Sequence, residues 1–314
     1  MNDVLKACEF FKEFDEFEIF THIHPDGDAL GSSFALKYAL EKMGKKAKVT
    51  CLDTFPEVFK YIWNVEENDF DAKKTVTVDV ADVILLGDGF DKNRVIDFAI
   101  DHHKNNKVEA KEVLCDPTCA ACGEIIYEIV KSLGVELDLY LSECLYTALA
   151  TDTGCFRFSN TTNETFLIAS HLTSHTPNNN FGYLNTPLFS TKSKKQISLE
   201  NAVFSSLSYA FDDKVAIALV SKDLIKSLDL SDDDLIGVEQ LAKCIKGVKV
   251  GITLKERDNG YKISMRSDDD VDVAQICAKF GGGGHHSAAG CFINGDESFA
   301  KHSLLTAIEE GGVI

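Results

Sequence analysis

The sequence lacks a long hydrophobic run and a secretory leader. No run of about 18 apolar residues occurs, so no segment is expected to span a membrane. The first 13 residues carry charges throughout, and they lack the apolar centre and the small-residue cleavage site of a secretory signal. These absences predict a cytoplasmic protein.

Basic residues are also scarce relative to acidic ones. The chain has 32 Lys and Arg against 50 Asp and Glu, which gives a formal net charge of -18. Proteins that bind long duplexes usually present a basic face. The charge balance therefore argues against a large nucleic-acid footprint. It is compatible with a small phosphate-bearing substrate held in a local pocket with metal ions.

The ten cysteines do not predict a disulfide framework. They are spread over nearly the whole chain, and reduced, mostly buried thiols are the expected state in a cytosolic protein. Cys115, Cys119 and Cys122 lie closer together, so a structural zinc site is conceivable, but a convincing fourth ligand is missing.

Internal repeats and low-complexity tracts are absent, and 45% of the 314 residues are hydrophobic. This length suggests two domains with substantial cores. Pro, Asn and polar residues accumulate around 176–196. We therefore predict an N-terminal catalytic domain over 1–180, a linker over 181–200 and a C-terminal substrate-binding domain over 201–314.

Hydrophobic periodicity predicts strands that alternate with helices in the first domain, which favours a mostly parallel α/β sheet flanked by helices. The second domain is expected to be a smaller α/β unit. Strands are predicted at 17–20, 47–52, 83–86, 215–220, 248–254 and 261–266. Helices are predicted at 4–14, 34–43, 93–98, 125–133, 141–151, 197–208, 235–245, 271–280 and 297–310.

Residues 21–33 form the most informative stretch. They follow an apolar strand and precede a helical pattern, so His22, Asp26 and Asp28 are expected on a strand-to-helix turn. Pro25 and Gly27 supply the bends that let their side chains converge. An imidazole and two carboxylates on one loop suit a divalent cation. The alternative is an ordinary turn with solvated carboxylates and a helix N-cap.

Further polar residues follow apolar segments along the chain. Asp88 follows the predicted strand 83–86. His102 belongs to Asp101-His102-His103, which follows the apolar pair Ala99-Ile100. Ligands of open α/β sheets bind at the carboxyl ends of the strands, so these side chains are expected to meet there. Three other carboxylates near Asp88 compete with it for a place among these converging side chains: Asp79, Asp82 and Asp91.

The ordered motifs resemble the DHH phosphoesterase family with its DHH-associated C-terminal domain, in particular its oligoribonuclease and pAp (3′-phosphoadenosine 5′-phosphate) phosphatase branch. The resemblance rests on His22-x3-Asp26-x-Asp28, on Asp88 followed by Arg94, and on Asp101-His102-His103. It rests further on Thr151-Asp152-Thr153-Gly154, on Arg266 and on the glycine segment 281–290. These motifs cover nearly the whole chain.

The resemblance implies two divalent metal ions. His22 and Asp26 correspond to ligands of one ion, whereas Asp28, His102 and Asp152 correspond to ligands of the other. Asp88 corresponds to the bridging ligand. Oxygen and nitrogen ligands without thiolate favour Mn²⁺, with Mg²⁺, Co²⁺ or iron as alternatives.

The resemblance also implies catalytic and substrate-binding residues. His103 corresponds to the histidine that faces the scissile phosphate, and Asp101 is expected to orient a neighbouring imidazole. Arg266 and His285 are expected to bind phosphate together with the backbone of Gly282, Gly283 and Gly284, because glycine lets amide groups approach an anion closely.

The function implied is hydrolysis of very short oligoribonucleotides to 5′-mononucleotides, and of pAp to AMP. One alternative is a phosphodiesterase for linear dinucleotides derived from cyclic-dinucleotide signals. Another is a non-catalytic nucleotide-binding module on the same scaffold. A homodimer is plausible from the resemblance. Single-strand exonucleases of the family are longer, and its pyrophosphatases have a different C-terminal domain.

Overall fold

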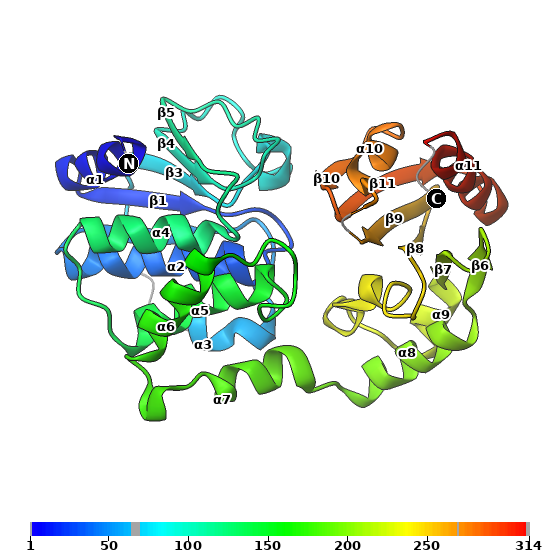
Figure 1. Ribbon diagram of the computed structural model, residues 1–314. Coiled ribbons are helices and arrows are strands. Elements are labelled where there is room, and N and C mark those ends of the chain that lie inside the picture. Colours follow the sequence, from blue (N-terminus) through cyan, green and yellow to red (C-terminus); the bar gives the residue numbers. More distant parts are fainter. Residues whose placement is uncertain (1, 64–69, 269, 312–314) are drawn as a thin grey trace. The chain divides into compact units, whose positions relative to one another are not determined.

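The computed structural model describes residues 2–63, 70–268 and 270–311. The chain divides into two compact units, Met1–Thr191 and Lys192–Ile314 (Figure 1). The division falls within 181–200, but this range is largely helical. It contains α7 (Gly182–Asn185), a π-helical turn (Thr186–Ser190) and the start of α8 (Lys194–Ser205).

The described part of the N-terminal unit is built on one parallel sheet with the strand order β2-β1-β3-β4-β5. Its strands are β1 (Glu16–Phe20), β2 (Lys46–Thr50), β3 (Lys74–Val78), β4 (Phe98–Asp101) and β5 (Glu112–Cys115). The strand order reverses at β1, because β2 and β3 lie on opposite sides of it. Such a reversal opens a crevice at the carboxyl ends of the two central strands. The predicted α/β class is confirmed.

α2 and α4 pack along one face of this sheet, and α5 packs against these two helices (Figure 1). Alternate strand residues such as Ile19, Val76 and Ile100 are fully buried in the core that includes these helices. The helices are α1 (Asn2–Glu13), α2 (Gly27–Lys42), α3 (Lys60–Trp63), α4 (Cys122–Ser132), α5 (Leu139–Asp152) and α6 (Asn163–Thr173). Short 3₁₀ turns lie at Glu57–Phe59, Val83–Leu86 and Pro177–Asn179.

The opposite face of the sheet is covered by the segment between β3 and β5. Phe20 and Ala99 pack there in a smaller cluster with Val80 and Leu86. Arg94 lies on the same side, where its guanidinium donates to Glu18 Oε2 at 2.5 Å and to Thr75 Oγ1 at 2.7 Å. The sheet is therefore buried on both faces, as parallel sheets usually are.

The described part of the C-terminal unit contains a mixed sheet with the order β10-β11-β9-β8-β7-β6. Its strands are β6 (Ser208–Ala210), β7 (Val215–Val220), β8 (Val250–Arg257), β9 (Gly260–Ser267), β10 (Gly283–His285) and β11 (Ala288–Asn294). Val215 and Ile217 of β7 face one core, and Ala216 and Ala218 face another. Besides α8, the helices are α9 (Lys222–Ser227), α10 (Val273–Ala278) and α11 (Glu297–Glu310), with 3₁₀ turns at Asp233–Leu235 and Val238–Gln240.

Most of the predicted elements are present, and the errors fall in both units. The predicted strand 83–86 is a 3₁₀ turn, and the predicted helix 93–98 is a turn that leads into β4. β3, β5 and α6 were not predicted, and 235–245 forms turns instead of a helix. The β3 sequence, Lys-Thr-Val-Thr-Val, alternates β-branched residues, which is the pattern of a strand.

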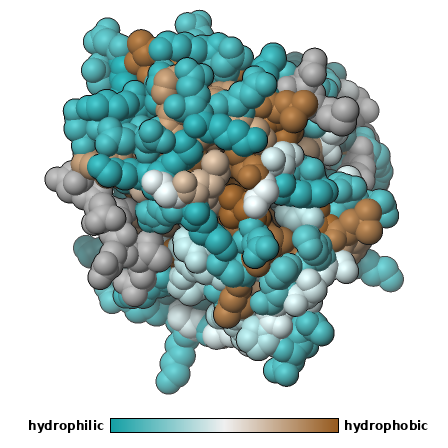
Figure 2. Space-filling view, turned by 90° about the vertical axis from the view of Figure 1, so that its left-hand side faces the viewer, coloured by the Kyte–Doolittle hydropathy of each residue, from teal (hydrophilic) through white to brown (hydrophobic). Residues whose placement is uncertain are grey.

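The exposed surface in Figure 2 is mainly hydrophilic, with hydrophobic residues between the hydrophilic ones. Single large hydrophobic side chains are exposed, for example Ile84 and Leu5. Scattered residues of this kind are normal on globular proteins. In the residue ranges that the structure covers, every helix is too short or too polar to cross a bilayer.

Candidate metal centre

His22 and Asp79 follow the two central strands, β1 and β3, at the point where the strand order reverses. His22 Nδ1 lies 2.8 Å from the carbonyl of Ile23, and Nε2 lies 3.9 Å from Asp79 Oδ2. A carbonyl oxygen can only accept, so Nδ1 carries a proton and Nε2 is the ring nitrogen that faces the carboxylate. Asp79 has a left-handed backbone (φ 59°), and its N–H donates to Ile100 of β4.

Asp26 joins these two residues. It is the N-cap of α2, and its Oδ1 accepts the Ala29 N–H at 3.0 Å. His22, Asp26 and Asp79 each offer a ligand atom, and these atoms lie within 4.8 Å of one another. Helix capping and metal binding are therefore compatible roles for this turn, because one carboxylate can cap the helix with one oxygen and face the cluster with the other.

Asp28 is buried in the first turn of α2 and lies against the N-terminus of α4. Its carboxylate accepts the N–H groups of Cys122 at 2.6 Å and Gly123 at 3.0 Å, and the hydroxyl of Ser32 at 2.8 Å. These donors, together with the positive end of the α4 dipole, compensate part of the cost of burying a charge. Asp28 is thereby fixed in one orientation.

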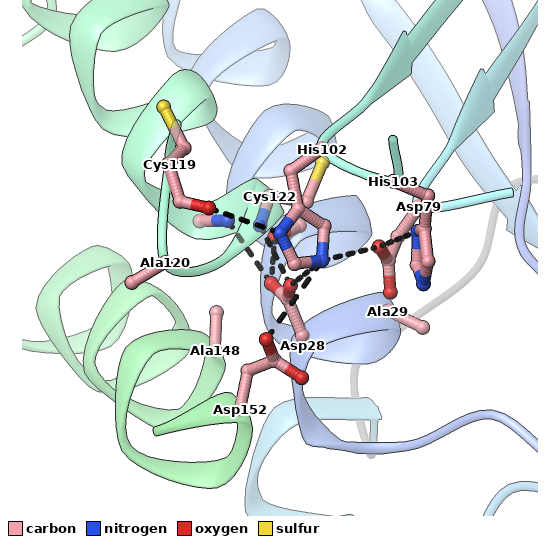
Figure 3. A network of polar contacts seen from close by, with 12 residues as sticks. Asp28, Ala29, Asp79, His102, His103, Cys119, Ala120, Cys122, Ala148 and Asp152 are labelled. Carbon is pink, nitrogen blue, oxygen red and sulfur yellow. Dashed lines mark hydrogen bonds and ion pairs between the residues drawn. The ribbon is translucent and has the colours of Figure 1, made fainter. Parts of the chain in front are cut away.

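His102 lies at the centre of the cluster (Figure 3). Its Nδ1 lies 3.2 Å from the Cys119 carbonyl and therefore carries the proton. Its Nε2 lies 3.6 Å from Asp79, 3.7 Å from Asp28 and 3.8 Å from Asp152. A neutral imidazole in this tautomer presents a lone pair where three carboxylates converge, which is the arrangement of a metal-binding histidine.

The electrostatics of the cluster fit a divalent cation. Oδ1 of Asp79 is fully buried and has no hydrogen-bond partner. Burial, reinforced by the charges of Asp28 and Asp26, raises the pKa of Asp79 well above its usual range. Burial likewise raises the pKa of Asp28 and of Asp152. A buried carboxylate oxygen without a donor is costly, and a bound cation would satisfy it.

Asp101 and His103 form a pair beside this cluster. His103 Nδ1 lies 2.7 Å from Asp101 Oδ1, and Asn106 Nδ2 donates to Asp101 Oδ2 at 2.6 Å. Although burial opposes both shifts, this pairing lowers the pKa of Asp101 and raises the pKa of His103. Asp79, Asp101 and His103 also offer ligand atoms within 4.8 Å of one another. The imidazole is therefore held in a fixed orientation next to Asp79.

Asp88 does not occupy the position that the sequence analysis gave it. It lies in an exposed turn after the 3₁₀ turn Val83–Leu86, and it belongs to none of the potential metal-binding groups among the described residues. The apolar run 83–86 predicts a strand but forms a 3₁₀ turn, so the carboxylate that follows it does not lie at the end of a strand. Asp79, which was weighed as a competitor, is the carboxylate that follows a strand.

The thiols of Cys115 and Cys122 donate to backbone carbonyls. Cys115 Sγ lies 3.4 Å from the His103 carbonyl, and Cys122 Sγ lies 3.8 Å from the Ile100 carbonyl. The potential metal-binding groups of the described residues contain no cysteine. These contacts give two of the thiols structural partners within the N-terminal unit.

The predicted substrate-binding residues lie in the C-terminal unit. Arg266 of β9 is partly buried, with one terminal nitrogen 3.9 Å from Glu239, and burial lowers its pKa. Gly283, Gly284 and His285 form the exposed strand β10, which pairs with β11. The Gly282 N–H donates to the Cys277 carbonyl at 3.0 Å. Gly282 is therefore bonded inside the unit and does not present its amide to an anion.

Two comparisons assign the chain to a family. The DHH family, N-terminal domain, matches residues 16–151, and the DHHA1 domain matches residues 212–310. The bifunctional oligoribonuclease and PAP phosphatase NrnA of Thermus thermophilus is 30% identical over 316 residues, which covers 98% of this chain and 92% of that protein. The chain belongs to the DHH family. This membership confirms the resemblance drawn from the motifs and supports a hydrolase of the phosphoesterase class.

Solved structures place this DHH protein in the same fold. An exopolyphosphatase-related protein from Bacteroides fragilis superimposes with a TM-score of 0.87 at 23% identity, over 98% of this chain and 96% of that one. RecJ from Thermus thermophilus, solved in complex with Mn²⁺, superimposes with a TM-score of 0.55 at 14% identity, over 98% of this chain and 55% of that one.

Proposed function

We propose that this DHH protein is a metal-dependent phosphodiesterase and phosphatase that hydrolyses very short oligoribonucleotides to 5′-mononucleotides and pAp to AMP. The observation that carries the proposal is the convergence of ligand atoms around Asp79, whose buried Oδ1 lacks a hydrogen-bond partner. The converging side chains are those of His22, Asp26, Asp28 and His102. The name of the Thermus thermophilus relative supports the substrate class.

Two groups of ligands support a site for two divalent ions. His22 and Asp26 would hold one ion, and Asp28, His102 and Asp152 would hold the other. Asp79 offers ligand atoms close to those of His22 and Asp26 and also to those of Asp28 and His102, so we assign it the bridging role predicted for Asp88. Asp152 Oδ2 lies 3.8 Å from His102 Nε2. Mixed carboxylate and imidazole ligands favour Mn²⁺, with Mg²⁺ or Co²⁺ as alternatives. Such ions would neutralise phosphoryl charge and activate water at neutral pH.

His103 would act on the substrate next to these ions. Asp101 holds Nδ1–H of His103 and keeps the imidazole in its protonated form to a higher pH. A protonated imidazole can donate a hydrogen bond to a phosphoryl oxygen or a proton to the leaving oxygen. In this role Asp101 orients the imidazole of His103 and raises its pKa. Asp101 itself does not contact the substrate.

Arg266, Gly283, Gly284 and His285 would bind a phosphate group of the substrate. A guanidinium and an imidazole suit phosphate oxygens, and exposed glycines permit close approach of an anion. The formal charge of -18 favours a short ligand over a polymer that needs a long basic face.

The test is a substrate series with purified protein and Mn²⁺. We expect release of mononucleotide from di- to pentaribonucleotides and release of phosphate from pAp, with little cleavage of a long single strand. Asp79→Asn and His102→Ala should lose activity by about 100-fold or more, and Asp88→Asn should retain it. Equal activity of Asp79→Asn and wild type would refute the proposed centre.

The remaining alternatives appear as other outcomes of the same series. Strong preference for a 5′-phosphorylated linear dinucleotide over all other substrates would identify the dinucleotide phosphodiesterase. Binding of nucleotides without hydrolysis by the Mn²⁺-loaded protein would identify a non-catalytic module.

A further inference from the structure

The backbone of the segment Cys119–Gly123 contacts two of the proposed metal ligands directly. The carbonyl of Cys119 accepts Nδ1–H of His102 at 3.2 Å. The N–H groups of Cys122 and Gly123 donate to the two oxygens of Asp28. The segment therefore sets the tautomer of the imidazole and the orientation of the carboxylate (Figure 3).

The same segment reaches a third ligand through a side-chain amide. Asn160 Nδ2 donates to the Ala120 carbonyl at 3.0 Å and to the Asp152 carbonyl at 3.1 Å. It also lies 3.5 Å from Oδ2 of Asp152. The position of Ala120 is thus coupled to the end of α5, where Asp152 lies.

The segment is itself fixed by the carboxylate of Glu124, which is only 4% exposed. Glu124 Oε2 accepts the Ala120 N–H at 3.1 Å, and Oε1 accepts the hydroxyl of Thr165 at 2.5 Å. Thr165 is fixed in turn, because it forms the capping box of α6 with Thr162. Glu124 therefore ties the segment to a second helix.

One peptide group connects Glu124 to His102. The Ala120 N–H that Glu124 accepts and the Cys119 carbonyl that His102 contacts belong to the same planar unit. A change in the orientation of that N–H must turn the carbonyl as well. Glu124 thus controls the hydrogen bond that leaves the Nε2 lone pair of His102 facing the carboxylates.

We propose that Glu124 is a positioning residue of the metal centre, which holds the Cys119–Ala120 peptide in the orientation that His102, Asp28 and Asp152 require. This inference rests on the proposed function, because it concerns the same site. Groups that are hydrogen-bonded directly to a metal ligand typically change metal affinity by about 10- to 100-fold when removed. Glu124 holds such a group in place, the Cys119 carbonyl.

Removal of Glu124 should act through the freed amide. In Glu124→Ala the buried Ala120 N–H loses its acceptor, and a buried amide without a partner turns towards water or another acceptor. The imidazole of His102 then loses its fixed carbonyl partner. Glu124→Gln should behave differently, because its Oε1 can accept the Ala120 N–H while its Nε2 donates to Thr165.

The experiment measures Mn²⁺ binding to the full-length protein by isothermal titration calorimetry, alongside the thermal midpoint of each metal-free variant. Glu128→Ala is the matched control, since Glu128 lies one turn further along α4 and pairs with Lys131 on the surface. We expect at least a tenfold weaker Mn²⁺ affinity in Glu124→Ala, near wild-type affinity in Glu124→Gln, and wild-type affinity in the control.

The outcomes separate this inference from the proposed function. A Glu124→Ala protein with a lower thermal midpoint and unchanged Mn²⁺ affinity would show a purely structural role and overturn the inference alone. A wild type that binds no Mn²⁺ would overturn the proposed function as well. If Glu124→Ala does not fold, Glu124→Asp replaces it. Its shorter reach should weaken Mn²⁺ binding relative to Glu124→Gln, and equal affinities of the two would refute the inference.

Discussion

Asp79 Oδ2 lies 3.9 Å from His22 Nε2, although the two residues follow different strands and are separated by more than 50 positions. Their strands are neighbours in the sheet, and the next strand on the other side of β1 is β2. The contact therefore lies at the reversal of strand order, where parallel sheets bind their ligands.

Replacement of Asp79 by Asn should stabilise the metal-free protein while abolishing activity. Burial, reinforced by the surrounding acidic groups, raises the pKa of this carboxyl. A raised pKa means that the native state binds the proton more tightly, so stability is lost as pH rises from about 4 through the raised pKa. With EDTA present, Asp79→Asn should gain about 1–3 kcal/mol over wild type at pH 8 and less at pH 5, measured by urea unfolding.

Mn²⁺ provides the counter-test for this prediction. Saturating Mn²⁺ should raise the thermal midpoint of wild type, because a ligand that binds only the native state stabilises it. The same addition should have little effect on Asp79→Asn. A variant that is destabilised without metal, or stabilised by Mn²⁺ as much as wild type, would contradict the assignment of Asp79.

Glu18→Gln should destabilise the N-terminal unit in a pH-dependent manner. Although burial opposes it, hydrogen bonds from Arg94 and Thr50 lower the pKa of Glu18. A lowered pKa gives stability that is present above the ordinary Glu pKa of about 4.3 and is lost as pH falls through the native value. We expect a loss of about 1–3 kcal/mol at pH 7 that shrinks below pH 4.3.

The control for Glu18 is Glu57→Gln, at a surface residue that pairs with Lys60. Chemical denaturation at pH 7 should show a change within about 0.5 kcal/mol for this variant. A similar loss of unfolding free energy in both variants would show that the Glu18–Arg94 pair contributes no more to stability than a surface ion pair.

Gly282 and Gly283 should respond differently to alanine. A Cβ at Gly282 would lie 2.1 Å from the Gly290 carbonyl, whereas a Cβ at Gly283 would have no neighbour within 4 Å. Gly282→Ala should therefore destabilise the C-terminal unit by about 1–3 kcal/mol, and Gly283→Ala should leave its stability unchanged. If Gly283 contacts substrate phosphate, Gly283→Ala should raise KM with little change in the thermal midpoint. An unchanged KM would remove Gly283 from the binding site.

His103→Gln should lower kcat by about 10²- to 10⁴-fold and leave Mn²⁺ binding intact, because His103 is assigned to proton donation. The matched control is His24→Gln, since His24 is 74% exposed and pairs with Asp53 on the surface. Steady-state kinetics at saturating Mn²⁺ give kcat, and calorimetry gives Mn²⁺ affinity. A loss of Mn²⁺ binding in His103→Gln would instead make His103 a ligand.

The sequence predicted the elements that carry their own signal. The predicted helix 34–43 lies almost wholly within α2, and the last predicted helix is α11. The predicted strands 248–254 and 261–266 are β8 and β9, which pair as a hairpin with Asn259-Gly260 at its turn. Each has a periodic apolar pattern or a turn dipeptide, and each forms from neighbouring residues.

The misassigned strand shows where sequence reasoning failed. Val83–Leu86 is more apolar than Lys74–Val78, yet Lys74–Val78 forms the central strand. Its threonines are buried against Arg94 and the covering segment, so polar side chains occupy strand positions that apolarity alone would not select. The β-branched alternation of β3 was the signal that could have identified Asp79.

The supporting contacts were beyond the reach of the sequence. In the sequence, Glu124 is a charged residue directly before the predicted helix 125–133. Its contacts with Ala120 and Thr165 depend on how α4 and α6 pack. Only the folded structure shows that this side chain lies one peptide group away from His102.

The division at Thr191 and Lys192 leaves all six proposed ligands on one side and Arg266 and His285 on the other. Each side has its own hydrophobic core. Substitutions in β10 and its neighbours can therefore change the proposed substrate-binding residues without repacking the core around the proposed metal ligands. The architecture is modular in this sense: the proposed metal ligands and the proposed substrate-binding residues belong to separately packed units.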